Sequence, residues 1–106
     1  MAHVGTVIAL TVNASVAEGT AVGIKHLMPE KSIQFSGMQS GTFSTVTCQI
    51  MGSNDNSNWT QIGSDVTTNS WVSVTYPVQF IRIDTTSYTS GTPVAVLCGY
   101  GPGYEA

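Results

Sequence analysis

Two cysteines and two histidines are the side chains of this 106-residue chain that most readily do chemistry. Neither His3 nor His26 has a carboxylate and a nucleophile around it in the pattern of a catalytic triad, and the chain has no nucleophile elbow. Two cysteines without nearby histidines do not complete a tetrahedral metal site. We therefore expect surface or interface histidines and no catalytic, cofactor-binding or metal-ligating residue. We therefore expect that this protein is not an enzyme.

The strand pattern places Cys48 and Cys98 on inward faces of different strands. There they could form a disulfide between two sheets, but buried free thiols are favoured. The reason is the N-terminus, where Met1–Leu10 lacks a basic start and a continuous apolar stretch and so does not resemble a secretory signal. We expect synthesis in a cytoplasm.

Asn54-Asp-Asn-Ser-Asn58 offers oxygen ligands and resembles the start of a calcium-binding loop. It lacks the central glycine and the terminal bidentate glutamate that such a loop needs. Asn, Asp and Ser also build tight turns, because their side chains hydrogen-bond the backbone a few residues further on. A turn between two strands is therefore favoured over a metal site.

Three other side chains could contact a ligand. Trp59 and Trp71 could stack on a sugar ring, although packing in the core or at a sheet edge is the more usual role of a strand tryptophan. Arg82 stands between two isoleucines. We expect its aliphatic part to pack on the sheet and its guanidinium to pair with Asp84, Asp65 or a loop carbonyl.

Charge is scarce in this chain. Three Lys and Arg and six Asp and Glu make up 8% of the residues, against roughly 25% in ordinary globular domains. Ser and Thr, 26 residues together, supply polar surface instead. A net charge of −3 with three cations suits neither a phosphate backbone nor an anionic membrane, so we expect no nucleic-acid and no membrane partner. So little surface charge is typical of a protein that works docked against another.

At this length the chain forms one domain, residues 1–106, around a single core. Runs rich in β-branched residues, separated by clusters of Gly, Asn, Asp, Ser and Pro, predict an all-β protein. About eight strands at this spacing indicate an antiparallel β-sandwich, either jelly-roll-like or immunoglobulin-like. The expected strands are Thr6–Asn13, Ala21–Leu27, Ser32–Ser36, Thr42–Met51, Trp59–Ile62, Trp71–Tyr76, Phe80–Asp84 and Pro93–Tyr100.

Alternation assigns faces to these strands. Val46, Cys48 and Ile50 share one face of their strand, which is the pattern of a half-buried strand. The strand Pro93–Tyr100 is apolar on both faces, so we expect it to be central in its sheet or covered by a neighbour.

Both ends of the chain are candidates for contact with a partner. Gly99–Ala106 is a Gly/Tyr-rich tail whose three glycines and proline oppose regular structure, and its tyrosines offer contact area at little entropy cost. The N-terminal strand could pair through its edge with another chain. The candidate partner-binding residues are Val7, Ile8, Leu10, Tyr100 and Tyr104.

Two segments carry a resemblance to a known family. Ile50-Met-Gly-Ser-Asn-Asp-Asn-Ser-Asn-Trp59, followed by Phe80-Ile-Arg-Ile83, resembles the core of discoidin-like sandwiches. Those domains have a Gly-Ser-Asn-Asp-Gly-x-x-Trp turn and a later Tyr-Ile-Arg strand. This chain has Asn56 in place of the second glycine and Phe80 in place of the tyrosine. It is also much shorter, so the ligand-binding spikes of that family are not carried over.

In length and style the chain is more similar to small virion proteins of tailed bacteriophages. The similarity spans roughly residues 33 to 98. It rests on Ile33-Gln-Phe-Ser-Gly37, the turn and the Ile-Arg-Ile strand described above, and Thr89-Ser-Gly-Thr92 before the last apolar strand. The resemblance implies a structural, non-enzymatic protein that decorates and stabilises a tailed-phage capsid.

The same resemblance implies the major capsid protein of the phage shell as partner and a homo-oligomer, with a trimer favoured. It also implies synthesis in the host cytoplasm and a final location on the capsid surface of the virion. Two alternatives remain open. One is a carbohydrate-binding module of a phage fibre, which would use Trp59 and Trp71. The other is a tail or baseplate accessory protein.

Overall fold

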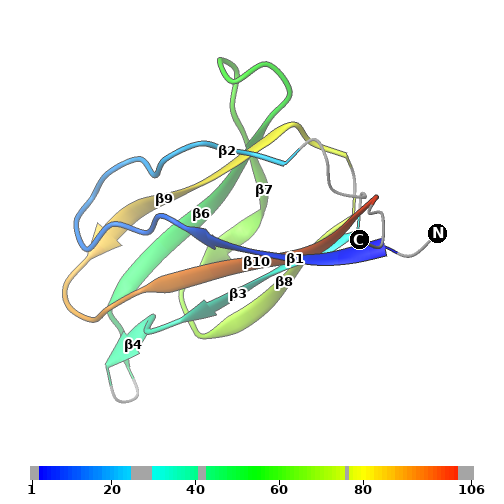
Figure 1. Cartoon of the computed structure of the whole chain (residues 1–106). Coiled ribbons are helices and arrows are strands. Elements are labelled where there is room, and N and C mark those ends of the chain that lie inside the picture. The colour runs from blue at the N-terminus through cyan, green and yellow to red at the C-terminus, as the bar shows by residue number, and fades with distance from the viewer. Residues whose placement is uncertain (1–2, 25–29, 41–42, 76, 103–106) are drawn as a thin grey trace.

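The chain forms two antiparallel four-stranded sheets packed face to face (Figure 1). The computed structural model describes residues 3–24, 30–40, 43–75 and 77–102. Sheet A has the strand order β1 (His3–Leu10), β10 (Val94–Pro102), β3 (Lys31–Ser36) and β8 (Ser70–Val74). Sheet B has the order β2 (Val22–Gly23), β9 (Phe80–Tyr88), β6 (Val46–Ser53) and β7 (Thr60–Val66). A small hairpin of β4 (Gln39–Ser40) and β5 (Phe43–Ser44) lies between β3 and β6.

The order of the strands identifies the type of sandwich. Apart from the β6–β7 hairpin, each connection between the strands of the two sheets passes from one sheet to the other. Counted along the chain without the small hairpin, the first strand pairs with the last and the second with the last but one. This nested pairing is that of a jelly roll. The all-β antiparallel sandwich is confirmed, and of the two expected types the jelly roll is the one observed. No helix occurs among the described residues, and hence none that is long and apolar enough to cross a membrane.

The last strand is central in sheet A, as its two apolar faces predict. β10 pairs with β1 along its whole length, from His3 opposite Pro102 to Leu10 opposite Ala95. On its other side it pairs with β3, from Val94 opposite Ser36 to Gly99 opposite Lys31. Both edges of β10 are therefore hydrogen-bonded, by strands from the beginning and from the first third of the chain.

The proposed C-terminal tail begins later than the sequence indicates. Gly99–Pro102 continues β10 instead of leaving the sheet, because β1 supplies a partner for each of these residues. Glycine costs entropy in a strand but does not prevent pairing, and Pro102 stands at the strand end, where a missing N–H is tolerated. Residues 103–106, including Tyr104, lie outside the described part of the chain.

The core lies between the inward faces of the two sheets. Val46, Cys48 and Ile50 point into it from β6, as the alternation predicts, and Ile81 and Ile83 do so from β9. The buried apolar side chains of this core are Leu10, Ile24, Ile33, Phe35, Met38, Val46, Cys48, Ile50, Ile62, Val66, Val74, Ile81, Ile83, Ala95 and Leu97. Their removal from water is the main favourable contribution to folding.

Several strand boundaries differ from those expected, for local reasons. Of Ala21–Leu27 only Val22–Gly23 pairs as a strand, and residues 25–29 lie outside the described part. Thr42–Met51 is interrupted at Thr45, whose backbone N–H donates to Met38 O and whose carbonyl accepts from Thr89 N. β7 runs on to Val66, and β9 continues to Tyr88 because both β6 and the Ala17 bridge pair with it.

Two of the motifs noted in the sequence, Ile33–Gly37 and Thr89–Thr92, pack against each other. Gly37 has φ +69°, and a Cβ on it would overlap the carbonyl oxygen of Thr92. A Cβ on Gly91, which has φ +112°, would lie 3.0 Å from Gly37 O. The close approach of the β3 end to the turn before β10 therefore depends on glycine.

We expect Gly37→Ala to lower the free energy of unfolding by at least about 3 kcal/mol, because it adds a collision with backbone to the cost of a positive φ. Gly63→Ala is the matched control, since Gly63 has φ +74° but no atom near its missing Cβ. The control should lose only about 1 kcal/mol. Urea unfolding of both variants measures the difference, and equal losses would show that the Gly37–Thr92 approach is not tight.

Candidate functional site

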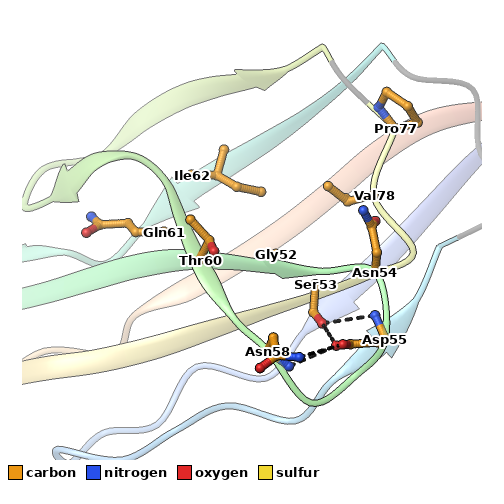
Figure 2. A pocket seen from close by; sticks show the side chains of 10 residues that line it. All are labelled: Gly52, Ser53, Asn54, Asp55, Asn58, Thr60, Gln61, Ile62, Pro77 and Val78. Carbon is orange, nitrogen blue, oxygen red and sulfur yellow. Dashed lines mark hydrogen bonds between the residues drawn. The ribbon is translucent and has the colours of Figure 1, made fainter.

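The turn between β6 and β7 is organised around one serine and one carboxylate (Figure 2). Ser53 Oγ accepts from the backbone N–H of Asp55 at 3.2 Å and of Asn56 at 2.9 Å, and donates to Asp55 Oδ1 at 3.0 Å. Asp55 Oδ1 in turn accepts from the backbone N–H of Ser57 at 2.9 Å and of Asn58 at 2.8 Å. Asn58 Nδ2 donates to Asp55 Oδ2 at 2.6 Å.

These contacts are those of a turn, which was the favoured prediction. The hydrogen bonds to Asp55, first those from Asn58 and Ser57, hold the pKa of its carboxyl well below the usual range. Both carboxylate oxygens already accept hydrogen bonds, whereas a calcium ion needs six to eight free oxygen ligands. The departure of Asn56 from the glycine of the discoidin-like pattern also has a physical reason. Asn56 has φ +60°, and after glycine asparagine is the residue that best tolerates this conformation.

Beside this turn lies an open pocket of about 350 Å³ at one end of the sandwich. One side is formed by the turn and the start of β7, and the other by Pro77 and Val78 from the β8–β9 connection (Figure 2). A Cβ on Gly52 would lie 2.6 Å from Ile62 Cδ1, so glycine at this position is what lets the Ile62 side chain pack against the backbone of β6. The pocket is lined by Gly52, Ser53, Asn54, Asp55, Asn58, Thr60, Gln61, Ile62, Pro77 and Val78.

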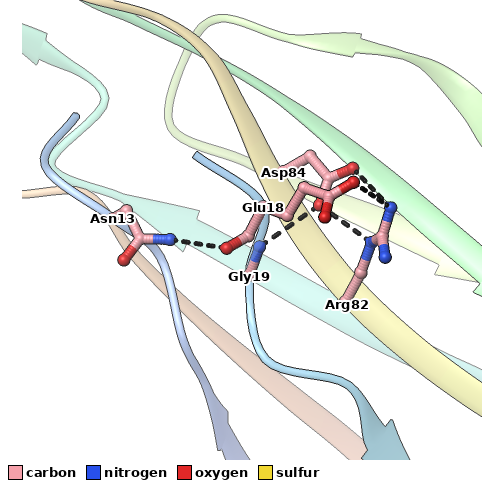
Figure 3. Close-up of polar contacts among 5 residues, drawn as sticks. All are labelled: Asn13, Glu18, Gly19, Arg82 and Asp84. Carbon is pink, nitrogen blue, oxygen red and sulfur yellow. Dashed lines mark hydrogen bonds and ion pairs between the residues drawn. The ribbon is translucent and has the colours of Figure 1, made fainter. Parts of the chain in front are cut away.

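A second polar cluster lies on the outer face of sheet B (Figure 3). Arg82 Nη2 lies 2.9 Å from Glu18 Oε2 and 3.3 Å from Asp84 Oδ2, and Arg82 Nε lies 3.0 Å from Asp84 Oδ1. Asp84 Oδ1 also accepts from Gly19 N–H at 3.2 Å. The expected pairing of Arg82 with Asp84 is confirmed. Glu18 was missed, because only the tertiary fold brings its loop to β9.

The two tryptophans do not form a joint platform for a sugar. The guanidinium carbon of Arg82 lies 4.3 Å from the centroid of the Trp59 ring, a cation–π contact that covers one face of that ring. Trp71 stands on β8 of the other sheet and is exposed. The structure thus gives Trp59 a packing role and places Trp71 on a different surface, apart from Trp59.

Of the five large apolar side chains that are exposed in the described part of the chain, all but Val16 lie on the outer face of sheet A. Val7 is 71% exposed, Trp71 68%, Tyr100 55% and Val94 47%. The register relates these residues across the sheet. On one side of β10, Val7 of β1 lies opposite Cys98. On the other side, Gln34 of β3 lies between Val96 of β10 and Trp71 of β8. Lys31 is the only Lys, Arg, Asp or Glu within β1, β3, β8 and β10, and its side chain is buried. This face, called the sheet A face below, is therefore uncharged in its described part, and it combines these apolar side chains with Gln34 and with serine hydroxyls.

The cysteines lie on different sides of their sheets, which corrects the prediction that both point inward. Cys48 is buried in the core, where burial raises the pKa of its thiol and its Sγ lies 3.8 Å from Thr85 Oγ1. Cys98 alternates with the inward Ala95 and Leu97 and so belongs to the sheet A face. Both are free thiols, and their opposite orientation excludes a disulfide between them.

The candidate partner-binding residues fall into three groups. Val7 and Tyr100 lie on the sheet A face. Leu10 is buried in the core, so its side chain is not available to a partner, and Ile8 is half-buried and packs against the core. Tyr104 and His26 lie outside the described part of the chain, and of His3 only the backbone in β1 is described. Val94 lies on the same face of β10 as Tyr100. The alternation of β10 predicts this position, but Val94 is not among the candidate partner-binding residues.

The pKa of Asp55 predicts a pH dependence of stability. Because the folded pKa lies below the unfolded value of about 3.9, the ionised carboxylate stabilises the fold above that pH. This contribution is lost as the pH falls through the folded pKa. We expect urea unfolding between pH 7 and pH 2 to show a steeper loss below about pH 4 for the native protein than for Asp55→Asn. Parallel curves would contradict the role of the carboxylate in the turn.

The Arg82 cluster predicts that lysine does not replace this arginine. Arg82→Lys keeps the charge but loses the planar group that contacts Asp84 and Trp59 together, so we expect a loss of about 1–2 kcal/mol in the free energy of unfolding. Glu18→Gln removes an exposed partner and should cost less than about 1 kcal/mol. Denaturation followed by tryptophan fluorescence measures both, and an unchanged Arg82→Lys protein would refute the argument.

The comparisons with known proteins give a likeness of fold. No protein-family model matches the chain, and no curated protein sequence matches it. Among solved structures, the SPBc2 prophage-derived protein YomS is similar, with a TM-score of 0.69 and 17% identity over 92% of this chain and 95% of YomS. At this identity the likeness shows that the chain shares the fold of YomS over nearly its whole length.

Proposed function

We propose that this chain is a structural, non-enzymatic virion protein of a tailed bacteriophage that decorates and stabilises the capsid. The observation that carries the proposal is the sheet A face, where Val7, Trp71, Val94 and Tyr100 are exposed together without a charged neighbour in the described strands. Large apolar side chains that are exposed on one face of a small protein are typical of a contact surface. The prophage origin of YomS, which shares the fold, and the resemblance to phage virion proteins support the phage context.

The chemistry of this face favours a protein surface as its partner. Trp and Tyr are enriched in the buried centres of protein interfaces, whereas charged residues are depleted there. A nucleic acid would need cations, and Lys31, the one cation in these strands, is buried. We therefore take the major capsid protein of the shell as the partner of the sheet A face.

The size of the face supports attachment through several copies. Four strands about 4.8 Å apart and about 25 Å long give a projected area of about 500 Å². This is a small docking surface for one copy, and a homo-oligomer that docks several such faces on symmetric neighbours would bind more tightly through avidity. The proposed decoration protein is therefore a homo-oligomer, with a trimer favoured.

The alternative of a glycan-binding fibre module loses its expected platform, because one face of the Trp59 ring is covered by Arg82, and Trp59 lies just before β7 of sheet B whereas Trp71 stands on β8 of sheet A. A tail or baseplate accessory would use the same face and differ only in the surface to which it docks.

The test is binding of the purified protein to expanded capsids of the parent phage. We expect saturable binding and capsids that resist higher temperature. Val94→Glu, which places a charge in the face, should weaken binding at least about tenfold, equivalent to about 1.4 kcal/mol. Ser64→Glu adds the same charge at an exposed position of sheet B and should leave binding unchanged.

Three results would decide against the proposal. Native protein that does not bind the shell would refute the decoration role. Equal weakening by Val94→Glu and Ser64→Glu would refute the sheet A face as the docking surface. Cryo-electron microscopy of the virion that places the protein on the tail or baseplate would replace the capsid by that component.

A further inference from the structure

The pocket beside the β6–β7 turn is not used by the proposed docking, since it lies at an end of the sandwich and not on the sheet A face. Its volume of about 350 Å³ lies within the range of small-molecule sites in proteins. It combines an apolar floor with a polar rim. Buried Ile62 and half-buried Val78 form the floor, and Asp55 and Asn58 stand on the rim (Figure 2).

The rim offers hydrogen-bonding groups that the protein itself leaves available. Among the described residues, no protein partner is shown for Thr60 Oγ1, Asn58 Oδ1 or Asn54 Nδ2. Asp55 Oδ2 accepts one hydrogen bond, from Asn58, and keeps capacity for more. Donors and acceptors thus surround one opening. The hydrogen bonds of Ser53 and Asp55 hold the β6–β7 turn that carries Asn54, Asp55 and Asn58.

The charge of the pocket restricts the class of ligand. Among the described residues that line it there is no Lys, Arg or His, and the one ionisable side chain, Asp55, is a carboxylate. Phosphate esters and acidic sugars would therefore be repelled without compensation. A metal ion is disfavoured as well, because the oxygens of Asp55 are engaged by Ser53, Ser57 and Asn58.

We propose that this pocket binds a neutral saccharide. Sugar hydroxyls both donate and accept, which matches a rim of amide, hydroxyl and carboxylate groups. The less polar face of a pyranose ring would lie on Ile62 and Val78, the apolar side chains that line the pocket. This site differs from the tryptophan platform considered above in position and in chemistry, since none of the described residues that line it is aromatic.

The saccharide site does not depend on the proposed capsid role, because sugar binding by the isolated protein and binding to capsids are measured independently. The direct test is nuclear magnetic resonance of the ¹⁵N-labelled protein titrated with glucose, galactose, mannose and N-acetylglucosamine, each to about 50 mM. Isolated sugar sites of this size bind with Kd in the millimolar range, or about −4 kcal/mol. We expect at least one of these sugars to shift the amide signals of Ser53–Thr60 and of Val78, and inorganic phosphate to shift none of them.

Thr60→Val tests the site with little change of shape, since it replaces a hydroxyl by a methyl group at an exposed position of β7. It should weaken the binding of the responding sugar about fivefold to tenfold, consistent with the loss of one hydrogen bond. Ser64→Ala, on the same strand outside the pocket, is the matched control and should bind as the native protein does.

Urea unfolding of both variants checks that the fold is retained. The proposal is overturned if none of the four sugars shifts the pocket signals. It is also overturned if the shifts centre on Trp71, or if Thr60→Val and Ser64→Ala bind equally.

Discussion

The pairing of the last strand with the first is the constraint on which the rest of this sandwich depends. Among the described strands, β10 alone is hydrogen-bonded to β1, and it also separates β1 from β3. β1 therefore joins sheet A only when the two ends of the chain have met. The pairing of β10 with β1 on one side and with β3 on the other fixes which side chains of β10 turn inward. Ala95 and Leu97 complete the core, and the alternate residues, including Val94 and Tyr100, must face outward.

The two sheets share one core but present different chemistry to the outside. Sheet B carries the ion pairs of Arg82 with Asp84 and with Glu18, and the hydrogen bonds of Gln49 and Gln61 to Asp65. Sheet A carries apolar and hydroxyl side chains. The pocket lies at the end of the sandwich, where the β6–β7 turn meets the β8–β9 connection. A docked sheet A face would therefore leave the turn and the pocket open to solvent.

Much of the fold follows from the sequence because strand alternation and turn chemistry are local signals. The inward set Val46, Cys48 and Ile50 and the turn at Asp55 were predicted in this way. The orientation of Cys98 was not, because a strand apolar on both faces does not say which face is the core. Gly99–Pro102 was misjudged for a similar reason, since only the distant β1 makes it a strand.

The site was less predictable than the fold. Val7 and Tyr100 were named from their residue type and place in the chain, and the alternation of β10 would have added Val94. Trp71 was named for a sugar and lies on the sheet A face instead. The pocket joins residues 52–62 to residues 77–78, which are brought together by the path of the chain between the sheets. No local pattern marks such a meeting.

The uncharged surface of sheet A also affects the kinetics of any encounter. Without charges to steer a partner, association proceeds at about 10⁵–10⁶ M⁻¹ s⁻¹, with little influence of salt. Occupation of many equivalent positions would then depend on the number of copies present and on slow dissociation, and not on long-range attraction.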